Sequence, residues 1–272
     1  MINVMVIGLP GDMATIATKR ILKEQNLSLI PYSITGNDID DEKIVINNIE
    51  IELIKANEIE KKNTIINKLK PFIAIDFTEP NAVHKNIEYY CRSDISFIMG
   101  TTGVVVNRIK QNIEESNICA VIAPNMGKQI VALQAMFEFA AENFPKCFTG
   151  YSLQITESHQ QNKLDTSGTA RSMINYFNTL GLKFDETMIE KIRDQNTQRT
   201  IGVPEKYLDG HAWHNYKLTS EDKSVFIQLK HNINGREIYA EGTISSIYYL
   251  DNKIKNGESG KIFSMIDVMK IA

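Results

Sequence analysis

Short apolar runs alternate with helical patterns over residues 1–125. The runs have the length of strands, and several are apolar on both faces, which is typical of parallel strands covered by helices. They are Ile2–Gly8, Leu27–Ile34, Phe72–Phe77, Ile95–Met99 and Ile118–Ala123. Helical spacing marks the segments between them, which are Met13–Lys23, Glu58–Lys70, Asn81–Cys91 and Val106–Glu115. This alternation predicts an α/β domain with a doubly wound parallel sheet.

The pattern changes after Pro124. Gly127–Phe144 is predicted to form one long helix, because its apolar pattern continues until Pro145. The strands expected in this part are Tyr151–Ile155, His211–Leu218, Val225–Asn232 and Glu237–Thr243. Turn signals separate the last three, at Ser220-Glu221-Asp222 and at Asn234-Gly235, so an antiparallel meander is predicted.

These later elements indicate a C-terminal α+β domain with a mostly antiparallel open sheet. A helix from Ala170 to about Leu180 would pack on that sheet. Ile244–Lys255 has a helical pattern and Lys261–Met269 is a final apolar piece, and we expect both to return to the first domain.

Composition narrows the class of protein. The 272 residues carry a net charge of −3, which gives no basic field for nucleic acid or an anionic membrane. No run approaches the roughly 18 apolar residues that a membrane span needs, and strand-like sequence from Ile2 leaves no room for a transit peptide. Cys91, Cys119 and Cys147 are far apart and show no metal spacing. We therefore expect a cytoplasmic or stromal protein with free thiols and no metal site.

A glycine-containing turn follows the first strand and opens the first helix. Gly8, Leu9, Pro10, Gly11, Asp12 and Met13 are the candidate cofactor contacts there. This is where a Rossmann-like dinucleotide fold needs glycines, although an ordinary strand–turn–helix has the same pattern. No acid lies in Pro31–Thr35, where a site for NAD usually has one, and Ser33 and Thr35 are candidate donors to a 2′-phosphate. The cofactor preference therefore stays open.

Two further motifs end strands of the predicted sheet. Gly100, Thr101 and Thr102 follow one strand, and Ala123, Pro124, Asn125 and Met126 follow another. The carboxyl ends of parallel strands line the ligand crevice, so both groups are candidate cofactor contacts. The alternatives are a tight turn for the first motif and a helix-start signal for the second.

The segment from Glu157 to Ala170 carries the strongest chemical signal. His159 and Lys163 precede a Thr166-Ser167-Gly168-Thr169 turn at a helix start. The first amides of a helix bind anions, and a nearby imidazole and ammonium can move protons. This combination favours chemistry on a small carboxylate. A satisfied polar histidine and a solvated lysine remain the alternatives, and structural roles are favoured for His211 and His231.

Over essentially its whole length the chain resembles the 4-hydroxy-tetrahydrodipicolinate reductases. The segment from Glu157 to Ala170 carries the resemblance, and Gly100–Gly103 and Ala123–Met126 resemble the family's nicotinamide-side motifs. Gln160 and Thr166 depart from the common bacterial pattern and resemble the plant and cyanobacterial branch. Asp12 and Ala14 also depart, since bacterial members commonly carry a basic residue and Gly there.

The resemblance implies NADPH or NADH as reductant and a cyclic dicarboxylate as substrate. It further implies that Lys163 donates the proton and His159 polarises the ring or assists, while Gln160, Ser167, Gly168 and Thr169 bind the substrate. It divides the chain into a dinucleotide-binding domain, residues 1–126 and 245–272, and a substrate-binding and oligomerisation domain, residues 127–244. A homotetramer assembled through the C-terminal sheet is expected. The alternatives are a non-catalytic assembly factor and a reductase of another cyclic imine carboxylate.

Overall fold

The chain folds into two compact units. The computed structural model describes residues 1–101, 106–163 and 165–270. One unit comprises Met1–Val131 and Glu237–Ala272, and the other comprises Ala132–Arg236. The C-terminal segment thus returns to the first unit, and each unit is described by itself below.

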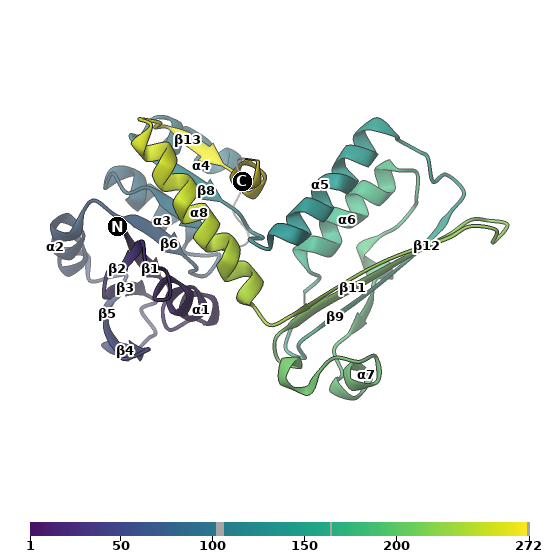
Figure 1. The fold of residues 1–272 in the computed structure, drawn as a ribbon, viewed down its shortest axis with the longest axis horizontal. Helices are drawn as coiled ribbons and strands as arrows, with labels where there is room; N and C mark the ends of the chain where they lie inside the picture. The colour runs from purple at the N-terminus through teal and green to yellow at the C-terminus, as the bar shows by residue number, and fades with distance from the viewer. Residues whose placement is uncertain (102–105, 164, 271–272) are drawn as a thin grey trace. The chain divides into compact units, whose positions relative to one another are not determined.

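A parallel sheet forms the centre of the first unit (Figure 1). In spatial order its strands are β13 (Lys261–Phe263), β8 (Cys119–Ile122), β7 (Phe97–Met99), β6 (Ile73–Asp76), β1 (Ile2–Ile7) and β2 (Leu27–Leu29). All neighbouring pairs run parallel. From β1 the chain leads to β2 on one side, whereas β6 leads to β7 on the other. The strand order therefore reverses between β1 and β6, and ligands bind at the carboxyl ends of strands at such a point.

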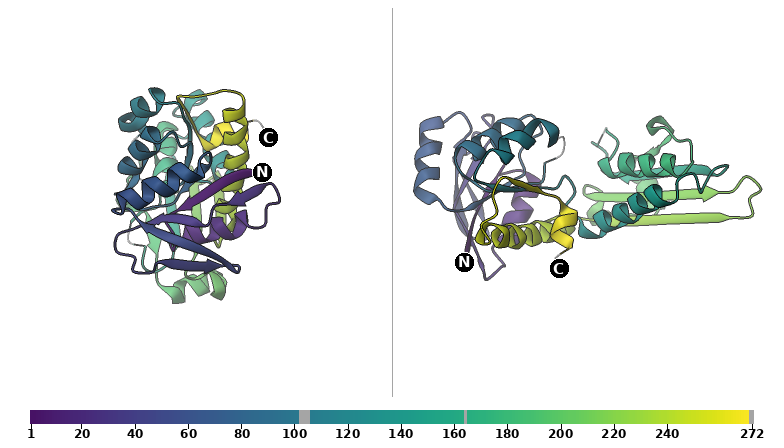
Figure 2. Two further views of the ribbon diagram at one scale, coloured as in Figure 1. Left: turned by 90° about the vertical axis from the view of Figure 1, so that its left-hand side faces the viewer. Right: turned by 90° about the horizontal axis from the view of Figure 1, so that it is seen from above.

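Helices cover both faces of this sheet (Figures 1 and 2). One face packs against α1 (Asp12–Ile21), α8 (Glu237–Lys255) and α9 (Met265–Met269). The other packs against α2 (Ile59–Leu69), α3 (Val83–Arg92) and α4 (Val106–Glu114). Successive residues of β1 supply both cores, with Val4 and Val6 in the first and Met5 and Ile7 in the second. The doubly wound fold expected from apolar runs is confirmed.

The run Leu27–Ile34 is two strands rather than the single strand expected. β2 ends at Leu29, and β3 (Tyr32–Thr35) joins a separate sheet with β5 (Ile49–Lys55) and β4 (Lys43–Ile46). Pro31 lies at the break, and proline has no N–H with which to continue a strand ladder. The apolar pattern did not predict β4 and β5. The small sheet that they form with β3 carries the chain from β3 toward α2.

The second unit is a mixed, mostly antiparallel sheet whose two long helices lie on one face (Figure 2). The strand order is β10 (Glu190–Ile192), β9 (Ser152–His159), β11 (His211–Thr219) and β12 (Phe226–Asn234). Only the β10–β9 pair runs parallel. α5 (Lys128–Asn143) and α6 (Gly168–Thr179) bury apolar side chains against β9 and β11. The shorter helices are η1 (Glu186–Met188), α7 (Gln195–Thr200) and η2 (Glu205–Tyr207).

The strand expected at Glu237–Thr243 is wrong. These residues are the first turns of α8, which continues to Lys255, so Asn234-Gly235 leads into a helix and not into a hairpin. At Gly242 a Cβ atom would lie 1.8 Å from the carbonyl oxygen of Met126. Only glycine allows this approach of α8 to the chain that leaves β8.

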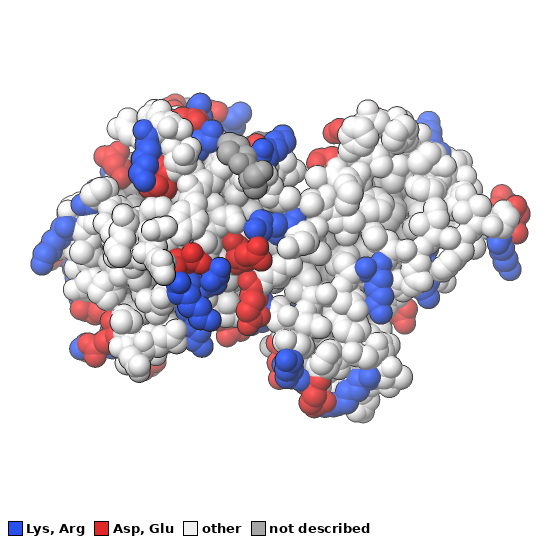
Figure 3. Space-filling view, in the orientation of Figure 1, with Lys and Arg blue, Asp and Glu red and all other residues white. Residues whose placement is uncertain are grey.

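The face drawn in Figure 3 shows no strong field of one sign. Lys and Arg side chains are interspersed with Asp and Glu on the face drawn in Figure 3. Among the described residues, the helices are all too short or too polar to cross a membrane.

Candidate active site

The turn after β1 has the shape of a dinucleotide-binding loop. Gly8 has φ +101°, and a Cβ atom there would lie 2.9 Å from the carbonyl oxygen of Phe77. The N–H of Gly11 donates to the Gly8 carbonyl oxygen at 2.9 Å, and α1 begins at the next residue, Asp12. Because the first amides of a helix are without intrahelical partners, this turn presents donors suited to a pyrophosphate.

A pocket of about 370 Å³ opens beside this turn. Its walls include Gly8, Leu9, Pro10, Gly11 and Asp12 from the loop and Phe77, Thr78 and Glu79 from the end of β6. The two walls come from β1 and β6, where the strand order reverses. The loop, the helix start and the pocket together fit a nicotinamide dinucleotide.

Ser33 and Thr35 support the loop from behind. The N–H of Leu9 donates to the Ser33 hydroxyl at 3.3 Å, and the Thr35 hydroxyl donates to the Leu9 carbonyl oxygen at 2.6 Å. Ser33 is fully buried, whereas Thr35 is among the residues that line the pocket. The structure thus places Ser33 behind the loop and brings only Thr35 to the pocket.

An acidic residue lies slightly beyond Pro31–Thr35 in the chain. Asp38 and Gly36 follow β3 and line the same pocket. The Asp38 carboxylate covers Gly36, because a Cβ atom on Gly36 would meet Asp38 Oδ1 at 2.4 Å. Position alone did not reveal this residue, since the apolar run was expected to be one strand ending at Ile34.

A buried carboxylate organises the other wall of the pocket. Asp76, at the end of β6, accepts hydrogen bonds from the N–H and hydroxyl of Thr78, at 2.8 and 2.7 Å. It also accepts from Asn86 Nδ2 at 2.9 Å and from the hydroxyl of Tyr90 at 2.7 Å. Burial, followed by the Asp76 charge, raises the pKa of Tyr90 well above its usual value, so Tyr90 acts as a donor.

The two remaining nucleotide-side motifs lie at the same edge of the sheet. The Thr101 hydroxyl donates to the Thr78 carbonyl oxygen at 2.7 Å, so the ends of β6 and β7 are joined. Gly100 packs against the ring of Phe77, and Thr102 lies outside the described residues. After β8, Ala123 and Met126 are buried, Pro124 is exposed, and Asn125 caps the N–H of Gly127 at 2.9 Å.

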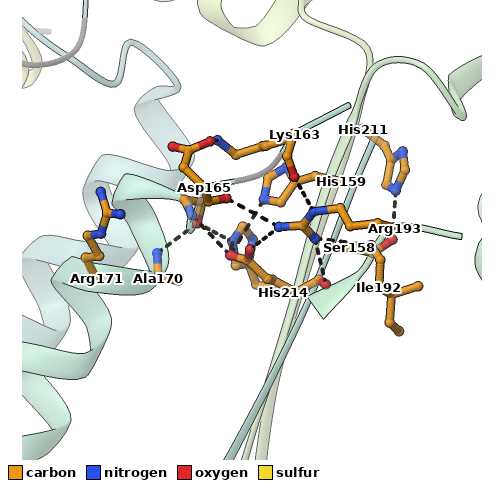
Figure 4. A network of polar contacts seen from close by, with 12 residues as sticks. Ser158, His159, Lys163, Asp165, Ala170, Arg171, Ile192, Arg193, His211 and His214 are labelled. Atoms are coloured by element: carbon orange, nitrogen blue, oxygen red, sulfur yellow. Dashed lines mark hydrogen bonds and ion pairs between the residues drawn. The ribbon is translucent and has the colours of Figure 1, made fainter. Parts of the chain in front are cut away.

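In the second unit, the polar centre begins on β9. Residues 153, 155, 157 and 159 alternate toward the helices, so Glu157 and His159 continue the inward face of Leu153 and Ile155. Glu157 is fully buried and forms an ion pair with Arg193, which follows β10 (Figure 4). A buried carboxylate requires a partner of opposite charge, and Arg193 supplies it.

Lys163 lies in the loop that follows β9. Its ammonium contacts Asp165 Oδ1 at 2.6 Å, and this hydrogen bond lowers the pKa of Asp165. Its carbonyl oxygen accepts from Arg193 Nε at 2.7 Å (Figure 4). Gln160 precedes Lys163, and its carbonyl oxygen accepts from the N–H of Lys163 at 3.1 Å.

The start of α6 is fixed by two side chains. Ser167 caps the helix, because its Oγ accepts from the N–H of Ala170 at 3.0 Å, and the same oxygen lies 2.8 Å from Nε2 of His214. The N–H of Ser167 donates to Glu157 Oε2 at 3.2 Å. The next residue, Gly168, faces open space, since a Cβ atom there would meet nothing within 4 Å.

Burial keeps the histidines of this centre neutral. It lowers the pKa of His159 to about 4, against the opposing effect of Glu157. Burial also lowers the pKa of His214 well below its usual value and that of His231 to about 4. Among the described residues, Nε2 of His159 has no hydrogen-bond partner. A neutral imidazole with an unused ring nitrogen can donate to or accept from a substrate.

The donor atoms of Glu157, His159 and His214 lie within 4.8 Å of one another. Such a set could bind a metal ion, but the guanidinium of Arg193 already pairs with the Glu157 carboxylate. The arrangement is therefore a buried ion pair with two neutral imidazoles beside it.

The structure brings only part of the predicted residues together, because Met13, Ser33, Gly100, Thr101 and Ala123–Met126 do not line the pocket. Gly8–Asp12 and Thr35 line the pocket of the first unit, and His159, Lys163 and the Ser167–Thr169 turn form the polar centre of the second. Sequence reasoning left out Asp38, Asp76, Glu157, Arg193 and His214. The alternation along β9 was the available signal for Glu157, because it placed a carboxylate on a buried face.

Two family models together match most of the chain. The one described as dihydrodipicolinate reductase, N-terminus, matches residues 2–126, and the one described as dihydrodipicolinate reductase, C-terminus, matches residues 129–269. The boundary between them falls where β8 leads into α5.

Curated relatives agree with these models. The probable 4-hydroxy-tetrahydrodipicolinate reductase 1, chloroplastic, of Oryza sativa subsp. japonica is 43% identical over 90% of this chain and 72% of its own length. The 4-hydroxy-tetrahydrodipicolinate reductase 1, chloroplastic, of Arabidopsis thaliana is 40% identical over 99% of this chain and 78% of its own.

A solved structure shares the fold. A dipicolinate-bound dihydrodipicolinate reductase from Paenisporosarcina sp. TG-14 superposes with a TM-score of 0.66 at 20% identity, over 97% of each chain. Taken with the family models and the plant relatives, the site geometry leads to one assignment. The chain belongs to the dihydrodipicolinate reductase family, also called the 4-hydroxy-tetrahydrodipicolinate reductases.

Proposed function

We propose that the protein reduces 4-hydroxy-tetrahydrodipicolinate to tetrahydrodipicolinate with NAD(P)H, a step of lysine and diaminopimelate biosynthesis. The single observation that carries this proposal is the polar centre of the second unit. There Lys163, a neutral His159 and the open amides at the start of α6 are grouped around one buried ion pair. That pair consists of the Glu157 carboxylate and the Arg193 guanidinium. Family membership and the names of the relatives support the same reaction.

Lys163 is the proposed proton donor. Loss of the 4-hydroxyl group and a neighbouring ring proton as water would first leave the ring conjugated. A nicotinamide bound at the glycine-containing turn would then supply a hydride to the far carbon of that system, with the electron pair moving toward the ring nitrogen to give an enamine. The product requires one proton, which the Lys163 ammonium delivers, and water restores it afterwards. In the free enzyme this ammonium is held by Asp165, whose side chain is largely exposed and can move away.

His159 acts as a neutral polarising group in this proposal. Its pKa of about 4 leaves it uncharged at neutral pH, so it does not act as an acid there. Its buried Nε2 has no hydrogen-bond partner among the described residues, and we propose that this nitrogen hydrogen-bonds the substrate when it binds and so polarises the ring.

The substrate carboxylate is proposed to bind the amides of Gly168 and Thr169. Both lie in the first turn of α6, where N–H groups lack intrahelical partners. The N–H of Ser167 is taken by Glu157 and its hydroxyl by His214 and Ala170. Ser167 therefore orients the turn, and Gly168 leaves space for close approach of the anion. Gln160 is a further proposed contact.

NADH is the proposed preferred reductant, with NADPH used less efficiently. Asp38 lines the pocket beyond β3, where an acid accepts hydrogen bonds from ribose hydroxyls and repels a 2′-phosphate. Among the described lining residues there is no Lys or Arg, whereas Asp12, Asp38 and Glu79 are present. A partly solvated charge of this kind favours NADH by about tenfold, which is compatible with use of both cofactors.

Assembly as a homotetramer through the C-terminal sheet remains our proposal. Glu237–Thr243 adds no strand to that sheet, because those residues are helical. β12 supports the proposal, since it is the edge strand of its sheet and exposes Phe226 and Ile227. Light scattering on the purified protein measures its mass.

We propose the cytoplasm or a plastid stroma as the location of the protein, in line with the chloroplastic relatives.

A coupled assay tests the proposed reaction. The substrate is generated in place by the synthase that precedes this step, and oxidation of NADH is followed by its absorbance. Turnover that depends on the synthase product supports the proposal. Binding of NADH without turnover would favour a non-catalytic assembly factor, and turnover only with other cyclic imine carboxylates would favour a different reductase.

A further inference from the structure

The loop between β9 and α6 carries Lys163 but little regular structure. Lys163 precedes a position outside the described residues, and Asp165 beyond it is exposed. A proton donor on such a loop needs a fixed backbone, because misplacement by about 1 Å can cost a hundredfold in rate. A group elsewhere in the second unit must therefore hold the backbone of Lys163 in place.

Arg193 makes contacts on both sides of Lys163. Its Nε donates to the Lys163 carbonyl oxygen at 2.7 Å, and Nη2 donates to the Asp165 carbonyl oxygen at 3.4 Å. In Figure 4 the guanidinium lies between this loop and the strand that carries His159. One planar group thus holds the loop before and after the undescribed position.

The same guanidinium is anchored to the sheet. It pairs with the buried carboxylate of Glu157 through Nη2, and Nη1 donates to the carbonyl oxygens of Glu157 and Ile192 at 3.4 and 3.1 Å. The Arg193 side chain is 17% exposed and that of Glu157 is fully buried. The anchor lies at the parallel β10–β9 edge, where Ile192 pairs with Ser158.

We propose that Arg193 is a positioning residue that locks the backbone of Lys163 to the β9–β10 edge through the Glu157 ion pair. The inference rests on the proposed role of Lys163 as proton donor. Lysine cannot replace arginine here, because the three donors of an ammonium all lie on one nitrogen. The guanidinium of Arg193 instead uses three nitrogens, and it contacts the Lys163 carbonyl oxygen with one and the β9–β10 edge with the other two.

Arg193→Lys is the first test, because it keeps a cation opposite Glu157 and so avoids an unpaired buried charge. We expect kcat to fall about tenfold or more, within the range for a displaced proton donor. The KM for NADH should not change, because the nucleotide pocket lies in the other unit. Arg199→Lys is the matched control, since Arg199 on α7 forms an exposed ion pair with Glu205, the first residue of η2.

A double-mutant cycle with Lys163→Ala separates this inference from the proposed reaction. If Arg193 acts through Lys163, Arg193→Lys should change kcat less than twofold in the Lys163→Ala background. Equal effects in both backgrounds, or an unchanged kcat in the wild-type background, would overturn the positioning role. Normal turnover by Lys163→Ala would instead contradict the proposed role of Lys163 as proton donor.

A second variant covers the case in which Arg193→Lys folds poorly. Arg193→Ala is assayed with and without added guanidinium ion, and circular dichroism verifies its fold. Recovery of kcat by guanidinium, but not by ammonium, is expected, because only the planar ion can restore donors along both directions. Equal recovery by both ions, or none in a folded protein, contradicts the proposal.

Discussion

The hydroxyl of Ser167 and Nε2 of His214 lie 2.8 Å apart, although 47 residues separate them in the chain. Because Ser167 Oγ accepts from the N–H of Ala170, its hydrogen is directed to the imidazole. Burial holds the pKa of His214 well below its usual value, so the ring stays an acceptor at neutral pH. The first turn of α6 is thereby fixed to β11.

Replacing this acceptor should weaken substrate binding. We expect His214→Phe, which keeps a ring beside His231 and Tyr216, to raise the KM for substrate about fivefold with little change in kcat. That ratio corresponds to the loss of one hydrogen bond of about 1 kcal/mol. Steady-state kinetics measure it. Ser172→Ala, on the exposed side of α6, is the control, and an equal effect there would point to a general change in the helix.

Removal of the proposed donor should leave binding largely intact. Lys163→Ala is expected to lower kcat about 10²-fold or more, the scale of general acid catalysis. Lys191→Ala removes an exposed lysine from the neighbouring strand and should have no such effect. Single-turnover measurements report the chemical step, and near-normal turnover in a folded Lys163→Ala protein would falsify the assignment.

Cofactor preference should follow the charge at position 38. Asp38→Asn removes the carboxylate from the pocket wall, so the ratio of kcat/KM for NADPH to that for NADH should rise about tenfold. Asp41→Asn changes an exposed acid that does not line the pocket and serves as the control. A wild-type preference above about a hundredfold for either cofactor, near 3 kcal/mol, would contradict dual use.

Asp76 should control cofactor binding from inside the core. Asp76→Asn puts an amide donor among the Thr78, Asn86 and Tyr90 donors, and we expect the free energy of unfolding to fall by about 1–3 kcal/mol. The KM for NADH should rise several-fold, because Thr78 and Asn86 line the pocket. Tyr90→Phe removes a donor that does not line the pocket. It should lower stability alone, so an equal rise in KM there would argue against a local effect.

Stability should fall as the pH drops from 6.5 to about 4. Buried His159 and half-buried His231 have folded-state pKa values of about 4, whereas a free histidine titrates near 6.5, so the unfolded chain binds more protons in this window. Urea unfolding at several pH values measures the slope. His231→Phe should make the fall smaller by about 1–2 kcal/mol, after allowance for the partial exposure of His231. If the unfolding free energy of His231→Phe falls with pH as steeply as that of the wild type, groups other than His231 account for the titration.

The sequence predicted the elements whose pattern is local. β1, β6, β7 and β8 were found because most of their residues are apolar and buried on both faces of the sheet. The first turns of α8 were mistaken for a strand, because a seven-residue segment with a short apolar run fits either period. Packing decided the matter, since Ala240, Ile244 and Ile247 recur at helical spacing on a buried face.

By itself the sequence determined the order of elements, the glycine turn after β1 and the helix-start turn at Ser167–Thr169, because each depends on neighbouring residues. Only the tertiary structure decided which side chains hold those turns in place. Arg193 reaches Glu157 across 36 residues, and the β9–β11 register pairs His214 with Glu157. These contacts depend on strand order and register, which are set by burial of the whole sheet and not by any local pattern.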